Sequence, residues 1–209
     1  MDSAPLDWQQ AYVAGTTPWD LRRATPPLAD LLASPLLASV GLGAGARVAV
    51  PGCGRGHDVR EFGRHGFDVT GFDLAPSAVD EARRLLELNR ARARVLCRDV
   101  FGLLPEFSAT FQLAYDYTFY CALRPPLRPA YARTLAGILA PGGMLLHLTF
   151  PMRSDLAGKD GRPPFLVTAQ DLRTSFEPLF DLVRELPASG SVPERVGAEH
   201  WYLWRKRVR

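Results

Sequence analysis

Three alternating glycines in the run VPGCGRGHDV are the first residues whose type and spacing could bind a ligand. Gly52, Gly54 and Gly56 follow a short apolar run at residues 47–50. Glycine leaves the backbone open to a ligand and permits a positive φ. The G-x-G-x-G spacing differs from the G-x-G-x-x-G of dinucleotide-binding loops, where a helix N-terminus faces a pyrophosphate. The loop is therefore expected to hold a nucleoside that carries an amino acid, although a tight strand-to-helix turn would have the same pattern.

Two acidic residues end the next two predicted strands. The carboxylate of Asp73, 19 residues after Gly54, can accept hydrogen bonds from both hydroxyls of a ribose. The alternative is that Asp73 only caps the following helix. Asp99 can accept from an adenine amine while Val100 covers the ring, or it can be a surface residue beside core side chains. In series with the glycine loop, the two acids favour an adenine nucleoside.

An aromatic run, YDYTFYC, ends the fourth predicted strand, where the reacting centre of a bound ligand is expected. Aromatic faces attract a cation such as a sulfonium by about 0.5–2 kcal/mol each. An aromatic core strand would give the same composition. If a general base is used, the candidates for it in this run are Tyr117, Asp116 and Tyr120.

The elements that must position these loops form a regular alternation between residues 46 and 150. Strands are predicted at 47–50, 67–72, 94–97, 111–115 and 144–150, and helices at 58–65, 75–89 and 131–139. This alternation indicates an α/β fold with a mostly parallel sheet, whose ligands bind beyond the carboxyl ends of the strands. An apolar helical stretch is expected at 28–40, and a helix and two late strands are expected within 151–209.

Taken together, the motifs resemble a class I S-adenosylmethionine-dependent methyltransferase. The runs that carry the resemblance are VPGCGRGHDV, VTGFDLAPSAV, RDVF, FQLAYDYTFYCAL and LAPGG. The runs TPWD, DYTFYCA and GRPPFLV are more specifically similar to the thiopurine S-methyltransferase superfamily and its plant halide/thiol branch, over roughly residues 8–205. The resemblance implies a Rossmann-like, mostly parallel seven-stranded sheet with helices on both faces. It implies one domain over residues 1–209, with an N-terminal lid (1–45), a cofactor-binding core (46–150) and substrate-side and terminal strands (151–209).

The resemblance also implies which residues contact the donor, S-adenosyl-L-methionine, and its product, S-adenosyl-L-homocysteine. They are Trp8, Tyr12, Trp19, Gly52, Gly54, Gly56, Asp73, Leu74, Asp99, Val100 and Tyr117. The acceptor pocket is expected to be walled by Trp19, Phe119, Phe165 and Trp201. For Trp201, alternation on a terminal strand is an equal alternative. Tyr12 departs from the Trp of the plant branch. Tyr117 stands where the animal thiopurine enzymes have an Arg, which favours a halide/thiol acceptor.

The expected reaction is in-line displacement of the donor methyl group by a small soft nucleophile, a thiol, bisulfide or a halide. Positioning and water exclusion can contribute about 7–11 kcal/mol in such a reaction. A general base is optional, because a thiol with a pKa of about 8.5 is already a few per cent thiolate at neutral pH. The four histidines have no ligand spacing, so no metal is expected. The alternatives are a thiopurine-type S-methyltransferase, a non-catalytic donor-binding module and a nicotinamide oxidoreductase.

Composition and charge indicate which broad classes of protein can be excluded. The 209 residues are 47% hydrophobic and 22% charged, which is typical of a globular domain. There is no long apolar segment and no secretory signal, and the three cysteines are scattered, so a cytoplasmic protein without membrane attachment is expected. The net charge is +3, and the dense basic run is confined to residues 205–209. The predicted partner is therefore a small-molecule acceptor and not a nucleic acid, and a monomer is expected.

Overall fold

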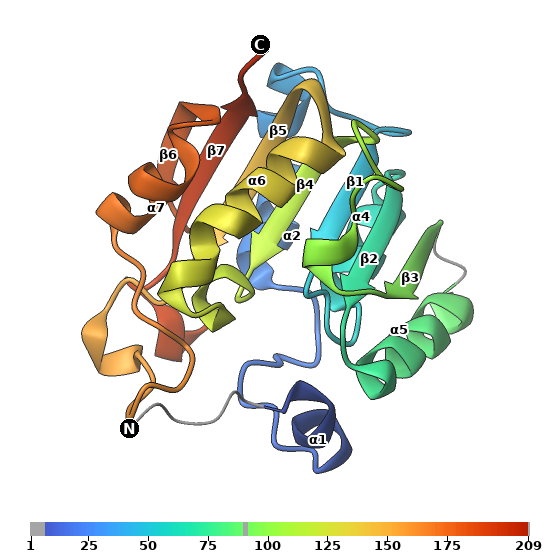
Figure 1. Cartoon of the computed structure of the whole chain (residues 1–209). Helices are drawn as coiled ribbons and strands as arrows, with labels where there is room; N and C mark the ends of the chain where they lie inside the picture. Colours follow the sequence, from blue (N-terminus) through green and yellow to red (C-terminus); the bar gives the residue numbers. More distant parts are fainter. Residues whose placement is uncertain (1–6, 90–91, 209) are drawn as a thin grey trace.

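The computed structural model describes residues 7–89 and 92–208. Seven strands form one sheet in the order β3-β2-β1-β4-β5-β7-β6 (Figure 1). The strands are β1 (Arg47–Pro51), β2 (Asp68–Asp73), β3 (Ala93–Cys97), β4 (Phe111–Tyr117), β5 (Leu139–Thr149), β6 (Phe180–Pro187) and β7 (His200–Lys206). The α-helices are α1 (Trp8–Val13), α2 (Pro26–Ala33), α3 (Leu36–Ser39), α4 (His57–Arg64), α5 (Pro76–Asn89), α6 (Arg128–Ile138) and α7 (Ala169–Phe176).

The first five strands of the chain are parallel, and β7 enters antiparallel between β5 and β6. Because the strand order reverses at β1 and β4, the loops that follow these two strands leave a crevice at the carboxyl edge of the sheet. The register brings the strand ends level, with Pro51 opposite Phe72 and Asp73 opposite Cys97. The loops that carry the candidate site therefore meet at one edge.

Apolar side chains alternate between the two faces of the sheet, as the pleat requires. Val48 and Val50 pack with α2, α3, α4 and α5 on one face, whereas Ala49 packs with α6 and α7 on the other. In Figure 1, α6 and α7 lie in front of the sheet. This confirms the predicted parallel sheet with helices on both faces.

Some boundaries differ from the predictions. The expected helix at 28–40 is two helices, because Pro35 has no backbone N–H to donate and Ser34 Oγ accepts from the Leu36 amide at 3.3 Å. Helix α6 begins at Arg128, before the predicted start at residue 131. Strand β5 begins at Leu139, five residues before the predicted start, because Leu139 already pairs with Phe111.

Residues 8–25, the N-terminal segment, lie at the carboxyl edge of the sheet and outside its two helical layers, whereas α2 and α3 belong to one of those layers (Figure 1). Tyr12 of α1 packs with Ala75 and Ala78 at the start of α5, and Trp8 and Trp19 cover this contact. The predicted lid spans residues 1–45, and its first six residues lie outside the described part of the chain.

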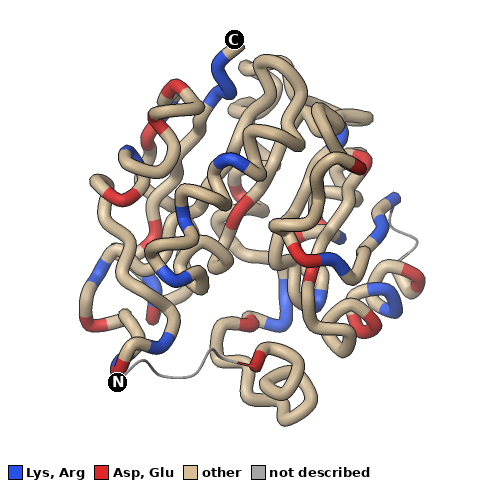
Figure 2. Tube along the Cα trace, viewed as in Figure 1, with Lys and Arg blue, Asp and Glu red and all other residues tan. Residues whose placement is uncertain are grey.

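Charged residues are spread over the fold, with Lys and Arg interspersed with Asp and Glu along several elements (Figure 2). Within the described residues, no helix is long and apolar enough to cross a bilayer.

Candidate functional site

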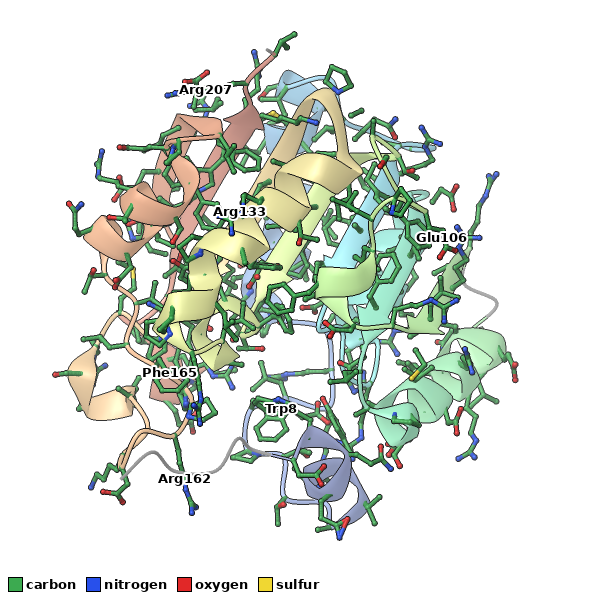
Figure 3. All side chains as sticks on the ribbon, viewed as in Figure 1. Trp8, Glu106, Arg133, Arg162, Phe165 and Arg207 are labelled. Carbon is green, nitrogen blue, oxygen red and sulfur yellow. The ribbon has the colours of Figure 1, made fainter. Side chains whose placement is uncertain are left out.

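A cavity of about 530 Å³ lies where the ends of β1, β2 and β4 meet the N-terminal segment. Seven segments contribute side chains to its wall: the glycine loop, the loops that follow β2, β3 and β4, residues 8–25, residues 150–164 and residues 194–195. Figure 3 shows the Trp8 side chain on the side of α1 that faces the sheet. The cavity therefore lies where ligands of doubly wound sheets bind.

The glycine loop is shaped by contacts that leave no room for a side chain. Gly52 has φ +59°, and a Cβ there would lie 2.1 Å from the Phe119 ring. Gly54 has φ +52°, and a Cβ there would lie 2.7 Å from the Tyr12 hydroxyl. Both residues line the cavity. Gly56 does not line it, and its missing Cβ instead lets α4 start close to Ala82 of α5.

Asp73 ends β2 with its carboxylate against the glycine loop. One oxygen accepts from the Gly54 amide at 2.8 Å and the other accepts from the Ala75 amide at 2.9 Å. Burial raises the pKa of this carboxyl above its usual value of 3.8. Each carboxylate oxygen can accept more than one hydrogen bond. Asp73 lines the cavity, so it can hold two ribose hydroxyls while it organises the turn.

The loop after β3 forms the adjoining wall. The Asp99 carboxylate accepts from the Phe101 amide at 3.0 Å and faces the cavity, together with Val100, which is 5% exposed. Leu74 lines the cavity as well. A polar acceptor beside an apolar surface fits the edge and the face of an adenine ring.

Three rings from the N-terminal segment cover the opposite side. Trp8 and Trp19 meet edge to face with centroids 5.3 Å apart, and Tyr12 and Trp19 do so at 5.9 Å. The Trp19 indole donates to the Tyr12 hydroxyl at 3.3 Å. All three rings line the cavity. They provide the aromatic faces that a sulfonium requires.

Arg55 of the glycine loop fastens this segment to the core. Its guanidinium donates to Thr17 at 2.9 Å, to Asp20 at 2.6 Å and to Glu81 of α5 at 2.5 Å. It also lies over the Tyr12 ring at 5.1 Å. A planar guanidinium suits such a multiple contact better than an ammonium.

Tyr117 lines the cavity at the end of β4. Its hydroxyl is hydrogen-bonded to Glu199 and to Arg195. The Arg195 guanidinium donates to the Trp19 carbonyl at 3.0 Å and lies 4.8 Å from the centre of the Phe150 ring. No sequence motif predicts a role for Arg195 or Glu199. The sequence feature that could have identified them is that both charged residues come shortly before the apolar run WYLW, which forms a buried strand.

Two proposed general bases do not reach the cavity. Side chains alternate along β4, so Asp116 points away from the face that carries Tyr115 and Tyr117. Its carboxylate accepts from the Tyr131 hydroxyl at 2.6 Å and lies 3.7 Å from His147. Asp116 is absent from the described wall of the cavity, so the structure assigns it to a buried polar cluster.

Tyr120 is also turned inward. Its hydroxyl is 2.7 Å from Ser175 and donates to the Asp171 carbonyl at 3.1 Å. Its side chain is fully buried and is absent from the described wall of the cavity. The helical turn after Phe119 directs Tyr120 toward α7, so it packs in the core and does not face a substrate.

Of the residues predicted to wall the acceptor pocket, some line the cavity and others are buried in the core. Trp19 and Phe119 line the cavity, and the positive φ of Thr118, +60°, turns Phe119 onto Gly52. Trp201 is 4% exposed and packs on Tyr115, with ring centres 6.3 Å apart, because alternation on β7 turns it to the core.

Phe165 is the fourth predicted wall residue, and it is also absent from the described wall. Its backbone amide donates to the Cys121 carbonyl at 2.7 Å, while the preceding Pro163 and Pro164 face the cavity. The segment that the motif identified therefore reaches the cavity, but through its two prolines.

Several separate parts of the cavity wall suit a ligand made of adenine, ribose and a sulfonium. The wall offers a carboxylate for a ribose, a polar and apolar loop for adenine, the backbone of Gly52 and Gly54, and three aromatic rings. Together with the strand order and the antiparallel β7, it defines a class I S-adenosylmethionine-dependent methyltransferase.

The family follows from comparison with known sequences. The thiopurine S-methyltransferase family model matches residues 3–207. This chain therefore belongs to the thiopurine S-methyltransferase family.

Relatives of this chain come from plants and from bacteria. A probable thiol methyltransferase 2 of Arabidopsis thaliana is 32% identical over 202 residues, covering 95% of this chain and 84% of the relative. Thiocyanate methyltransferase 1 of Brassica oleracea is 33% identical over 202 residues, with the same coverage. A thiopurine S-methyltransferase of Gluconobacter oxydans is 29% identical, covering 95% of this chain and 92% of the relative.

Solved structures share the fold. A protein described under conversion of a disulfide bond into a thioacetal group during echinomycin biosynthesis has a TM-score of 0.76 and 21% identity, over 96% of this chain and 91% of the other. The 1,6-didemethyltoxoflavin-N1-methyltransferase of Burkholderia thailandensis, solved with S-adenosylhomocysteine, has a TM-score of 0.72 and 24% identity, over 97% and 86%.

Proposed function

We propose that this methyltransferase moves the methyl group to a small soft nucleophile, a thiol, bisulfide or a halide. The observation that carries this proposal is the chemistry of the wall beyond the aromatic rings. There, Phe119, Phe150 and two prolines line the cavity together with the buried guanidinium of Arg195, which lies 4.8 Å from the centre of the Phe150 ring. A largely apolar wall that carries a buried cation suits a small, weakly hydrated anion.

The residues of the wall have separate tasks in this proposal. Asp73 holds the ribose, Asp99 and Val100 hold the adenine, and the Trp8, Tyr12 and Trp19 rings surround the sulfonium. The donor, S-adenosylmethionine, supplies an already activated methyl group when it is bound. The protein then has to align the acceptor with the methyl carbon and exclude water, which is where most of its rate enhancement is expected to arise.

The acceptor end attracts and shields the nucleophile. The Arg195 side chain is 8% exposed, so its charge acts through little water. Tyr117 stands beside it and presents its hydroxyl oxygen. The names of the plant relatives, thiol and thiocyanate methyltransferases, support this acceptor class. The name of the bacterial relative, thiopurine S-methyltransferase, supports a thiopurine as the alternative acceptor.

We further propose that the protein acts as a cytoplasmic monomer. The cysteines at positions 53, 97 and 121 are free thiols, which supports a reducing compartment. Sedimentation of the purified chain should give a mass near 23.0 kDa.

The test is an acceptor panel with methyl-labelled S-adenosylmethionine and mass detection of products. Iodide, thiocyanate, bisulfide, a small alkanethiol and 6-mercaptopurine are compared at equal concentration. Turnover of iodide, bisulfide and the alkanethiol at least about tenfold above 6-mercaptopurine is expected, a difference of about 1.4 kcal/mol in transition-state free energy. Preference for 6-mercaptopurine would favour the thiopurine alternative. Donor binding without methylation of any acceptor would leave a binding module.

A further inference from the structure

Three polar side chains, the half-buried Tyr117 and the buried Arg195 and Glu199, meet at the acceptor end of the cavity, and we call them the Tyr117 triad. Arg195 Nη1 and Glu199 Oε1 both contact the Tyr117 hydroxyl and lie 4.0 Å from each other. Tyr117 and Arg195 line the cavity, whereas Glu199 lies behind them. The Glu199 side chain is 1% exposed.

The hydrogen bonds in the triad have a fixed direction. A guanidinium can only donate, so the Tyr117 oxygen accepts from Arg195. The phenolic proton must then point to Oε1 of the Glu199 carboxylate. A hydroxyl oxygen has two lone pairs, so one remains after the contact with Arg195. Tyr117 can therefore take a proton from an acceptor in the cavity while it gives its own proton to Glu199.

Glu199 has capacity for that proton. Its second oxygen, Oε2, is buried and has no hydrogen-bond partner among the described residues. An unsatisfied buried carboxylate oxygen is costly, because nothing replaces the water it has lost. Burial also raises the pKa of Tyr117, so at neutral pH this residue is a phenol that can relay a proton but cannot store a negative charge.

Glu194 also lines the cavity but is exposed to solvent, and the other titratable groups near Tyr117 are already engaged. Tyr115 donates to Asp58 at 3.0 Å, and Asp58 also accepts from the Thr25 hydroxyl at 3.0 Å and from the Thr25 amide at 2.7 Å. His200, which follows Glu199 in the chain, lies 3.5 Å from Glu185 and is not part of the described cavity wall. Within the described residues, Glu199 is the carboxylate in direct contact with Tyr117.

We propose that Glu199 accepts, through Tyr117, the proton that a thiol must lose during methyl transfer. This inference rests on the proposed function and extends it. As the thiol sulfur forms its bond to the methyl carbon, the carbon–sulfonium bond breaks and its electron pair returns to the donor sulfur. The thiol proton moves to the Tyr117 oxygen, and the Tyr117 proton moves to Glu199. Glu199 is thus a positioning residue that acts through Tyr117, and it returns its proton to water as the products leave.

The proposal separates two kinds of acceptor. A thiol brings a proton that must go somewhere, whereas iodide brings none. Removing the carboxylate charge of Glu199 should therefore slow methylation of a thiol and spare methylation of iodide. A purely structural role would affect both acceptors alike.

The experiment compares Glu199→Gln with the wild-type enzyme on iodide and on an alkanethiol whose pKa is well above the assay pH. The kcat for the thiol should fall about 10- to 100-fold, the lower part of the range for a lost general base, while kcat for iodide stays within about twofold. From pH 6 to 8 the wild-type rate on the thiol should be nearly constant. The variant rate should rise about tenfold per pH unit, because it can use only preformed thiolate.

Two further variants make the result decisive. Tyr117→Phe keeps the ring and the Arg195–Glu199 pair but removes the relay, so the ratio of kcat for the thiol to kcat for iodide should fall as it does in Glu199→Gln, and combining the two substitutions should lower that ratio no further. It also provides the test if Glu199→Gln fails to fold. Glu185→Gln is the matched control, because that side chain is 41% exposed and lies on β6 away from the cavity wall. It should leave both acceptors unchanged.

Two results would overturn the role of Glu199. One is an equal loss on iodide and thiol, and the other is a thiol pH profile in Glu199→Gln that matches the wild type. If the wild-type enzyme turns over neither acceptor, the failure lies in the proposed function, and the proton relay falls with it.

Discussion

At the residue scale, the Asp73 carboxylate both accepts structural hydrogen bonds and lines the cavity. It holds the glycine loop and the start of α5 through backbone amides, and it also lines the cavity, where we propose that its remaining lone pairs hold the ribose. The choice between a helix cap and a ligand contact is therefore not exclusive. The structural contacts preorganise the carboxylate for the ligand.

Asp73→Asn should weaken binding of S-adenosylhomocysteine about 10- to 100-fold at pH 7, because hydrogen bonds to a charged group contribute about 1.5–3 kcal/mol. In the wild type, burial raises the pKa of Asp73 above 3.8, so affinity should begin to fall at a pH above that value as acid protonates the carboxylate. The same raised pKa favours the folded state below pH 3.8, and this contribution is lost as the pH rises through the folded-state pKa. The early loss of affinity is therefore not unfolding driven by Asp73.

Calorimetry between pH 4 and 7 measures the affinity for S-adenosylhomocysteine and so checks both the loss in Asp73→Asn and the fall of the wild-type affinity in acid. Asp68→Asn, at the exposed start of β2, is the control. The variant Asp73→Asn should lack the acid-side change. A wild-type affinity that stays constant down to pH 4 would contradict the assignment.

The sequence located residues that directly follow predicted strands, such as Gly52, Asp73 and Tyr117. Arg195 could not be found in that way, because it joins Tyr117 from 78 positions along the chain and lies in a short turn without periodicity. Asp116 was misplaced for a different reason. Its neighbours were predicted as a loop, whereas they continue β4, so alternation decides its direction.

At the scale of elements, Arg55 joins the N-terminal segment to α5 through Thr17, Asp20 and Glu81. This arrangement supports the lid proposal, because the segment is joined to the core by a limited set of polar contacts, which also includes Trp19 with Arg195 and Thr25 with Asp58. Gln9 provides another pair with Ser77, at 2.8 and 3.0 Å.

Arg55→Lys should release the lid in part, since an ammonium cannot reproduce the planar fork. Limited proteolysis should cut residues 8–25 about tenfold faster than in the wild type, as expected if about 1.4 kcal/mol of closure is lost. S-adenosylhomocysteine should protect the wild type more than the variant. Arg83→Lys, on the exposed side of α5, is the control. Equal cleavage of the wild type with and without the ligand would end the lid proposal.

The elements themselves were largely predictable, because buried parallel strands and amphipathic helices have strong periodicity. The split of residues 28–40 was missed although Pro35 signals it, since apolar residues continue across the break. The early start of β5 at Leu139 could not be seen locally. Pairing with Phe111 extends that strand through Pro141, a residue that favours a turn in isolation.

At the scale of the whole molecule, the cavity is built from nearly the full length of the chain. S-adenosylhomocysteine at about 100 times its Kd should stabilise the fold by about 2.7 kcal/mol. For a chain of this size that corresponds to a rise in Tm of about 5–11 °C.

NAD at the same concentration should shift Tm by less than about 1 °C, because the G-x-G-x-G loop offers no pyrophosphate site. Thermal denaturation followed by fluorescence measures both. Equal shifts would instead favour a nicotinamide enzyme.

The hydrogen bond from Arg195 to the Trp19 carbonyl spans 176 positions. During synthesis, Trp19 leaves the ribosome long before Arg195 has been made, because translation adds about 5–20 residues per second. Until Arg195 has been made, the chain lacks the cation beside Phe150 that holds the Trp19 carbonyl. The residues proposed to hold the donor, at positions 8–117, all precede it in the chain, so the acceptor end of the cavity is completed after the donor end.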